Sequence, residues 1–186
     1  MTMNPPVETV VRDTRDWLER AVIGLNLCPF AKAVHVKGLV HYAVSGAMRP
    51  RQLLNDLAAE LDGLLAHDPM VRETTLLIAP GCLHNFLDFN DFLAQADRLL
   101  RKRRLQGVVQ LASFHPAYQF AGTEPDDVTN FTNRSPYPTL HLLRETSIDR
   151  AVEAIARPED VFEANMKTLR SLGREGWDAL GIGPRK

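Results

Sequence analysis

Short apolar segments alternate with long amphipathic segments in the middle of the chain, and this alternation limits the folds that it can adopt. The short segments have the length and hydrophobicity of strands, and they span 39–44, 74–79 and 108–114. The long segments repeat apolar residues at helical spacing and span about 50–66 and 88–104. A strand–helix–strand–helix–strand order over 39–114 predicts a βαβαβ core with parallel strands and right-handed crossovers.

Further elements are expected on both sides of this core. Apolar residues on one helical stripe predict an N-terminal helix at about 7–25, which Pro29 prevents from continuing. Residues 139–143 are predicted as a fourth strand. We therefore predict a single α/β (or α+β) domain over 1–186, with a mostly parallel four-stranded sheet built on a βαβαβ core and flanking helices.

The C-terminal region is predicted to be helical. Ser147 can cap a helix that runs to about 156, and a last helix opens at Pro158. Gly173 is expected to stop it, so that the C-terminal helices cover about 147–172. The glycine-rich tail beyond Gly173 is expected to be irregular.

The charge balance does not favour a nucleic-acid or membrane partner. A net charge of −1 gives no whole-chain reason to expect a nucleic-acid or membrane partner. The one basic run, Arg101 to Arg104, ends a predicted helix, where positive charge complements the helix dipole. No apolar run approaches the ~18 residues of a membrane span, and no signal peptide is recognisable. Two cysteines are too few for a disulfide framework, so we expect a cytoplasmic protein with reduced thiols.

A long polar loop at 113–145 is the strongest candidate for a functional site. Loops of this length inside a compact domain are usually functional or disordered, and this one holds too many aromatic residues, including Tyr118, for disorder. It begins at His115, which Pro116 holds extended at the carboxyl end of a predicted strand. Ligands in open α/β sheets bind beyond such ends, so His115 is a candidate acid or base near neutral pH.

A second cluster lies later in the same loop. Arg134 offers a fork of donors suited to a carboxylate or phosphate, and Asn130 and Asn133 would orient such a ligand. In the alternative, the two asparagines satisfy the loop backbone and Arg134 pairs with Asp126 or Asp127. The loop re-enters the sheet near His141, a second candidate acid or base, which shares a strand face with Thr139 and Leu143. Arg144 and Glu145, at the end of that strand, are expected to pair with each other.

Cys28 is the third candidate catalytic residue. A cation can lower a thiol pKa and make it nucleophilic, and Lys32 or a histidine could do so here. The alternative is a small buried side chain, which is the commoner role of an isolated cysteine and the one expected for Cys82. A zinc site from Cys28, His115 and His141 is a further alternative, although the close ligand pairs of structural zinc sites are missing. No dinucleotide, P-loop, zincin, hydrolase-elbow or CxxC signature identifies a cofactor.

Four long motifs resemble the DUF1415 family of uncharacterised bacterial proteins. They read WLERAVIGLNLCPFAKA, FLDFNDFL, SFHPAYQFAG and NFTNRSPYPTLHLLRE, and the similarity covers about 7–172. The resemblance implies a stand-alone bacterial cytoplasmic protein, and it implies no activity, cofactor or catalytic residues. The motifs contain Cys28, His115, Asn130, Asn133, Arg134 and His141.

These observations lead to an expectation of an enzyme that acts on a small anionic molecule. Arg134, the two asparagines and Tyr118 would bind the anion, a histidine would transfer protons, and Cys28 would serve as nucleophile or thiol ligand. The main alternative is a non-catalytic module that binds a small molecule or a protein through the loop. A single site requires that Cys28, His115, Arg134 and His141 converge in one pocket.

Overall fold

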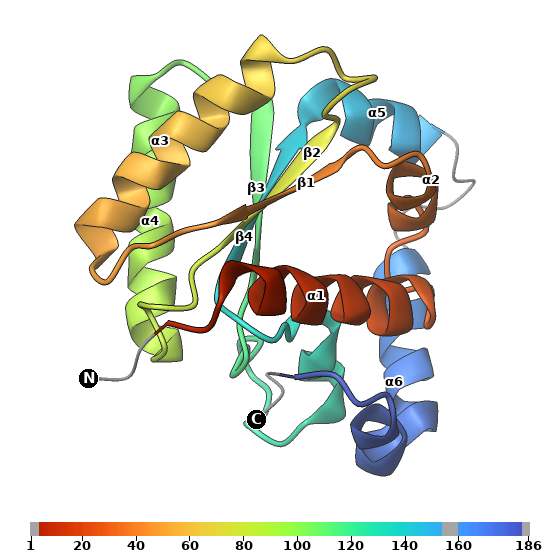
Figure 1. The fold of residues 1–186 in the computed structure, drawn as a ribbon. Helices are drawn as coiled ribbons and strands as arrows, with labels where there is room; N and C mark the ends of the chain where they lie inside the picture. The colour runs from red at the N-terminus through yellow and green to blue at the C-terminus, as the bar shows by residue number, and fades with distance from the viewer. Residues whose placement is uncertain (1–3, 154–159, 184–186) are drawn as a thin grey trace.

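The computed structural model describes residues 4–153 and 160–183, which form a four-stranded sheet with helices on both faces (Figure 1). The elements follow one another as α1 (Val7–Trp17), the π-helix η1 (Leu18–Ile23), α2 (Ala31–Val36), β1 (Val40–Val44), α3 (Pro50–Ala66), β2 (Thr74–Ile78), α4 (Phe86–Lys102), β3 (Val109–Phe114), the 3-10 helix η2 (Val128–Asn133), β4 (Thr139–Arg144), α5 (Glu145–Glu153) and α6 (Asp160–Ala179). The predicted core strands and helices are confirmed to within two residues at each end.

The sheet has the order β1-β2-β4-β3. Only β1 and β2 pair in parallel, and β4 is antiparallel to both of its neighbours. The prediction of a mostly parallel sheet is therefore wrong, because the chain after β3 turns back and places β4 between β2 and β3. The three strands of the βαβαβ core still run in one direction, so their carboxyl ends lie along one edge of the sheet.

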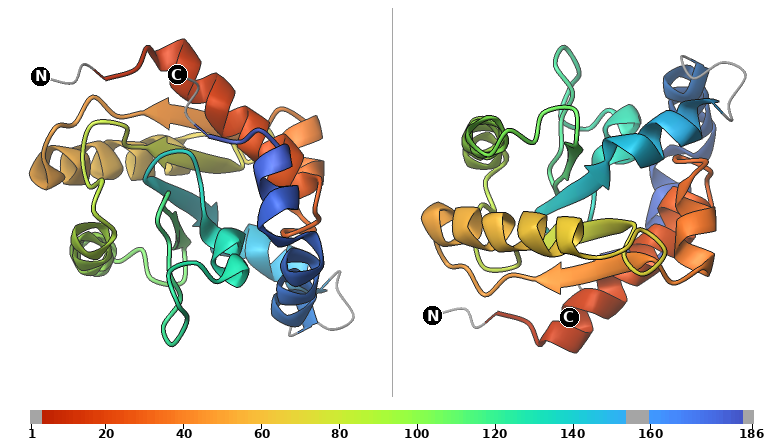
Figure 2. Two further views of the ribbon diagram at one scale, coloured as in Figure 1. Left: turned by 90° about the horizontal axis from the view of Figure 1, so that it is seen from below. Right: turned by 90° about the horizontal axis from the view of Figure 1, so that it is seen from above.

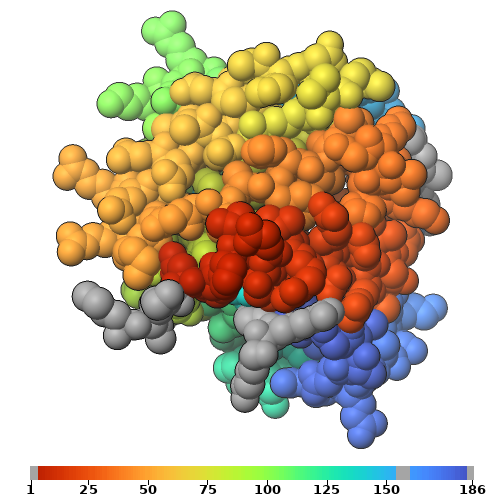
Figure 3. Space-filling view, in the orientation of Figure 1, coloured from red at the N-terminus to blue at the C-terminus, as the bar shows by residue number. Residues whose placement is uncertain are grey.

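Helices cover both faces of this sheet. On one face α3 and α4 bury an apolar layer against the strands, with Leu57 and Phe92 opposite Leu77 and Leu142. On the other face α1, η1 and α6 form a second layer (Figure 2). The N-terminal helix and α6 lie side by side there (Figure 3), and Asn165 of α6 donates to the Leu27 carbonyl at 2.9 Å. Because β2 lies between these two apolar layers, both of its faces are covered, and every residue of β2 is buried.

The C-terminal region differs from the prediction in two ways. First, α5 begins at Glu145, directly after β4, so Ser147 lies inside this helix and does not cap it. Second, helical turns resume after Gly173: this residue takes the non-helical angles φ 68° and ψ −178° and interrupts the helix where the sequence predicted its end, but a further helical segment of α6 follows the kink. The tail expected to be irregular is helical to Ala179. The predicted end of one helix at 154–156 and start of the next at 158–159 lie outside the described residues.

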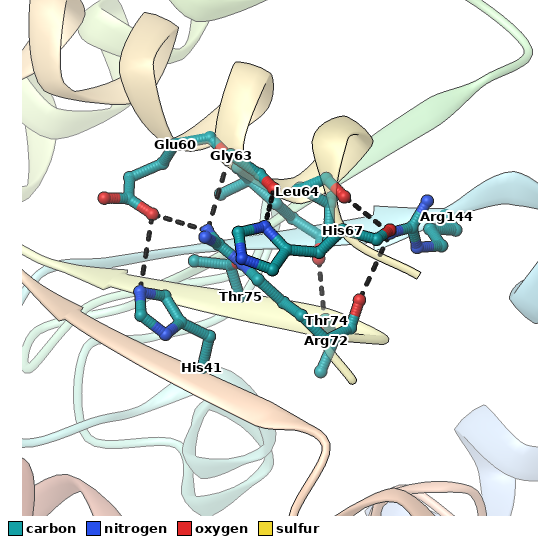
Figure 4. Close-up of polar contacts among 10 residues, drawn as sticks. His41, Glu60, Gly63, Leu64, His67, Arg72, Thr74, Thr75 and Arg144 are labelled. Carbon is teal, nitrogen blue, oxygen red and sulfur yellow. Dashed lines mark hydrogen bonds and ion pairs between the residues drawn. The ribbon is translucent and has the colours of Figure 1, made fainter. Parts of the chain in front are cut away.

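Polar contacts fasten the end of α3 to the sheet (Figure 4). The last carbonyl groups of a helix lack partners within the helix and attract positive charge. Arg144 Nη2 donates to the carbonyls of Leu64, His67 and Arg72, at 2.5, 2.7 and 3.2 Å. Arg144 thus binds the end of α3, and its expected pairing with Glu145 is not seen in the described structure.

A buried arginine strengthens the same junction. Arg72 precedes β2, donates from Nε to Thr75 Oγ1 at 2.9 Å and forms an ion pair with Glu60 of α3 at 2.5 Å. His41 of β1 lies 3.7 Å from the same Glu60 carboxylate (Figure 4). Side chains from β1, β2 and β4 therefore meet at one helix end.

Replacement of Arg144 tests the strength of this junction. Arg144→Ala leaves three carbonyl groups without their charged donor, and we expect the free energy of unfolding to fall by about 1–3 kcal/mol. Urea denaturation measures the change, with Arg101→Ala, an exposed arginine of α4, as the control. Equal losses in the two variants would contradict the assigned role.

Candidate functional site

The loop that joins β3 to β4 and the bent end of α6 enclose a pocket at the carboxyl edge of the sheet. In Figure 1 this loop and η2 lie below the sheet, beside α6. The pocket, which we name the loop–α6 pocket, is open to solvent and has a volume of about 230 Å³. Its walls are formed by Pro116, Phe131, Arg134, Ser135, Pro136, Arg174, Trp177, Asp178, Ile182 and Gly183.

Two arginines share one aromatic ring in this pocket. The Cζ atoms of Arg134 and Arg174 lie 4.6 and 5.6 Å from the centroid of the Phe131 ring. Trp177 packs against the same ring, with 4.9 Å between the centroids. The guanidinium planes can therefore interact with the ring electrons, which is a favourable contact for a cation.

Arg134 combines a structural role with its place in the pocket wall. Its Nε donates to the Tyr118 carbonyl at 3.3 Å and its Nη2 to the Pro125 carbonyl at 2.6 Å, which holds the loop in place. The expected partner Asp127 instead accepts from the backbone and hydroxyl of Thr129, at 2.8 and 2.7 Å. No ion pair to Arg134 is present in the described residues. Burial, and then repulsion by Arg174, lowers the pKa of Arg134.

Arg174 is a pocket residue that the sequence analysis did not identify. Its Nε lies 3.1 Å from both carboxylate oxygens of Asp178, which leaves both Nη atoms without a partner among the described residues. The missed signal was the spacing of Arg174, Trp177 and Asp178, which places all three on one face of a helix. The expectation of an irregular tail concealed this spacing.

The two candidate asparagines hold the loop together. Asn130 is fully buried, and its Oδ1 accepts from Phe120 N at 2.9 Å and Thr123 Oγ1 at 2.8 Å. Its Nδ2 donates to the Glu124 carbonyl at 2.8 Å, and Asn133 Nδ2 donates to the Ser113 carbonyl at 3.1 Å. Neither lines the pocket, and both satisfy loop backbone as the alternative interpretation expected.

Tyr118 also lies outside the loop–α6 pocket. Its ring packs between Phe86 and Phe120, with centroid distances of 5.2 and 5.0 Å. Its carbonyl oxygen is one of the acceptors that hold Arg134. The residue therefore supports a pocket side chain without contacting the pocket itself.

His115 connects the end of β3 to the loop that follows β2. The residue is fully buried, its Nδ1 accepts from Ala117 N at 3.0 Å, and its Nε2 donates to the Leu83 carbonyl at 3.0 Å. Both ring nitrogens are thus engaged in a neutral imidazole. Desolvation by burial lowers its pKa, which the hydrogen bond to the Leu83 carbonyl partly offsets.

His141 is enclosed between β4 and β2. The Thr74 hydroxyl donates to the Leu142 carbonyl at 2.8 Å, so it accepts the proton of His141 Nε2, which lies 2.5 Å away. Burial lowers the pKa of His141 to about 4. The imidazole is therefore neutral at neutral pH, and its Nε2 is bound by the Thr74 hydroxyl within the sheet.

The two cysteines lie apart from the loop–α6 pocket. Cys28 follows η1, is half-buried and packs on the α1–α6 side of the sheet. Cys82 lines a second hollow of about 520 Å³ where α3 and α4 begin. Burial, and then repulsion by Asp56, raises the pKa of the Cys82 thiol. In the described ranges, no group of three His, Cys, Asp or Glu side chains converges to hold a metal, so the geometry does not support a zinc site.

The predicted convergence of the candidate residues is not seen. Arg134 lines the loop–α6 pocket, whereas Cys28, His115 and His141 line neither of the two hollows described above. The catalytic roles assigned to these three residues stay predictions without support from the geometry.

The buried state of His141 predicts a dependence of stability on pH. The ordinary pKa of histidine is 6.5, and the folded protein lowers it to about 4. Below pH 6.5 the histidine is protonated in the unfolded chain but stays neutral in the folded protein. Its contribution to the free energy of unfolding is therefore fully present above pH 6.5 and is lost as the pH falls toward 4. At about 1.4 kcal/mol per pKa unit, this contribution reaches about 3 kcal/mol.

Denaturation at several pH values measures this effect. The free energy of unfolding of His141→Gln should fall less between pH 6.5 and 4 than that of the parent. His84→Gln, which removes an exposed histidine, should keep the parental slope. An unchanged slope in His141→Gln would show that another group dominates.

Iodoacetamide labelling tests the environment of the thiols. Cys28→Ser leaves only Cys82, whose burial and raised pKa both disfavour the reactive thiolate. We expect labelling of the folded variant at pH 8 to be at least about tenfold slower than in urea. Cys82→Ser, which leaves the half-buried Cys28, is the matched control. Equal rates in the folded and unfolded Cys28→Ser protein would contradict the assignment.

A protein family matches the chain over most of its length. The family described as "Protein of unknown function (DUF1415)" matches residues 9–179. No curated protein and no solved structure shows significant similarity to the chain. Within the described part of the chain, no helix is long and apolar enough to cross a membrane. The match confirms the resemblance carried by the four sequence motifs, and the chain belongs to the DUF1415 family.

Proposed function

We propose that this protein binds a small anionic molecule in the loop–α6 pocket. The observation that carries the proposal is the pair of guanidinium groups, Arg134 and Arg174, that face one Phe131 ring beside a single carboxylate, Asp178. Repulsion by Arg174 contributes to the lowered pKa of Arg134, and an anion that contacts both groups would offset this repulsion. Guanidinium groups also match the geometry of carboxylate and phosphate oxygens.

The donors needed for such a ligand are free. Arg134 uses Nε and Nη2 to hold the loop, and Nη1 has no partner in the described structure. Among the residues that the structure describes, Arg174 uses only Nε, for Asp178. The Phe131, Trp177 and proline rings line the hollow beside these donors, while Arg174 and Asp178 remain largely exposed to solvent.

The proposal concerns binding, and it assigns no proton transfer to the histidines. Both nitrogens of His115 are engaged, and His141 is enclosed in the sheet. A pocket of about 230 Å³ suits a small molecule better than a nucleic acid or a protein segment. We place this binding in the bacterial cytoplasm, which the two free cysteines and the family resemblance support.

Ligand screening tests the proposal. Thermal shift and calorimetry with small carboxylic acids and phosphates should identify binders, and Arg174→Ala should weaken each by about tenfold or more, since a charged hydrogen bond contributes about 1.5–3 kcal/mol. Arg174 is a cleaner target than Arg134, because Arg134 also holds the loop. Arg170→Ala, an exposed arginine of the same helix outside the pocket, is the matched control. If Arg174→Ala responds to every binder like the parent, the proposal is wrong.

A further inference from the structure

We infer that the free edge of β1 pairs with the same edge of a second copy of this chain, in antiparallel register centred on Tyr42. The pairing joins two sheets into one continuous sheet with four strands from each copy. This interaction surface lies apart from the loop–α6 pocket, and the inference does not depend on the proposed anion site. It follows from the hydrogen-bonding groups that the two edges of the sheet leave without partners.

The strand β1 presents a row of backbone groups at one edge of the sheet. Ser45 N donates to a carbonyl of β2 at 2.8 Å, and the Leu39 carbonyl accepts from the chain that enters β2 at 3.0 Å. Odd-numbered residues of β1 therefore face β2. Because backbone groups alternate in direction along a strand, the N–H and C=O groups of Val40, Tyr42 and Val44 point away from the sheet. None of these groups has a partner in the part of the chain that the structure describes.

The opposite edge of the sheet, formed by β3, is closed at both ends. At its start Val109 N donates to the Leu105 carbonyl at 3.0 Å. At its end the Ser113 carbonyl accepts from Asn133 Nδ2 at 3.1 Å, and His115 N donates to the Asn133 carbonyl at 3.1 Å. The turn before β3 and the loop after it thus bond to outward-facing groups of this strand. The fold protects the β3 edge and leaves the β1 edge free within the described residues.

The strand β1 also lacks the features with which proteins usually protect an edge strand. Such strands carry charged side chains or proline, contain a bulge, or lie under another element. The sequence VHYAV has no lysine, arginine, acidic residue or proline, and its register with β2 is continuous. The helix α1 packs on one face, with Arg15 Cζ 5.4 Å from the Tyr42 ring centroid, yet four of the five residues of β1 are not buried. In Figure 3 the strand reaches the surface between α1 and the chain that follows α3.

The sequence of β1 is complementary to itself. Val40 and Val44 flank Tyr42 at equal spacing, so the outward-bonding residues read the same in both directions. In an antiparallel pair centred on Tyr42, the two tyrosines face each other and Val40 faces the partner's Val44, and aromatic pairs of this kind stabilise antiparallel strands. On the other face His41 lies opposite the partner's Ala43, so no like charges meet. This register pairs every free N–H group of one copy with a free carbonyl of the other, which explains why a second copy fits the edge.

Light scattering of the full chain, coupled to size-exclusion chromatography, tests the inference. We expect the mean mass to rise toward twice that of the monomer as the protein concentration increases from about 1 to about 100 µM. A parent protein that stays monomeric throughout this range would overturn the inference, including the case in which the β1 edge binds an extended segment of another protein.

A pair of variants locates the interface. Val44→Pro removes one outward N–H group and leaves the hydrogen bonds to β2 in place, and proline is tolerated at such positions of edge strands. Val44→Ala also shortens the side chain but keeps the N–H group, so it is the matched control. By symmetry the proline deletes two hydrogen bonds of the dimer, and we expect Val44→Pro to dimerise at least about tenfold more weakly than Val44→Ala. Thermal melting verifies that both variants fold, and equal dimerisation of the two would show that the interface lies elsewhere.

Amide hydrogen exchange of the parent, resolved to single residues, tests the same interface without a variant. The Tyr42 N–H group is free in the monomer and bonded in the dimer, so its exchange should be several-fold slower at about 100 µM than at about 1 µM. The Leu111 N–H group is the internal control, since it points outward in the middle of the β3 edge and has no partner among the described residues. Its exchange should not change with concentration. If the Tyr42 and Leu111 amides respond alike, the assigned edge is wrong.

Discussion

The pairing of β4 with both β2 and β3 is the constraint on which the remaining structure depends. A strand that enters the middle of a sheet must find hydrogen-bonding partners on both sides, and β4 finds them in antiparallel register. The chain leaves β3 at one edge of the sheet and must return to that edge before β4 can begin. A tight turn would be enough to join two adjacent antiparallel strands, but the residues between Phe114 and Thr139 form a long excursion outside the sheet instead.

This excursion explains the polar composition of the loop. Backbone groups outside a sheet still need partners, and the loop supplies them from its own side chains. Asn130 forms hydrogen bonds with three groups of the loop, and Arg134 donates to two of its carbonyls. His115 joins the loop to the turn after β2 through a hydrogen bond to the Leu83 carbonyl. The side chains that the sequence suggested for a functional site are thus largely engaged in hydrogen bonds that hold the loop together. An extended histidine at a strand end is as suitable for a clamp between two loops as for acid–base chemistry.

The helices and core strands were predictable from the sequence because hydrophobic periodicity is a local property. The direction of β4 could not be predicted, because an apolar segment such as 139–143 has the same sequence pattern in a parallel and in an antiparallel sheet. The end of α6 was missed for another reason. A glycine after a helix usually marks its end, and Gly173 does interrupt the helix, but only the backbone shows that helical turns resume beyond it. Five of the ten pocket residues lie beyond that bend, and three of these, Arg174, Trp177 and Asp178, are on the helical segment that follows it.

The loop–α6 pocket consequently lies between two segments, and a different feature of the fold determines the position of each. The sheet order positions the loop, and the bend at Gly173 positions Arg174 and Trp177. Phe131 joins them, since both guanidinium groups and the Trp177 ring contact it. Because Arg134 is already held by the Tyr118 and Pro125 carbonyls, a ligand would meet a guanidinium that needs little ordering, which reduces the entropy lost on binding. Arg174 is exposed, and within the described residues Asp178 is its one ion-pair partner, so most of the ordering on binding would fall on the C-terminal side of the pocket.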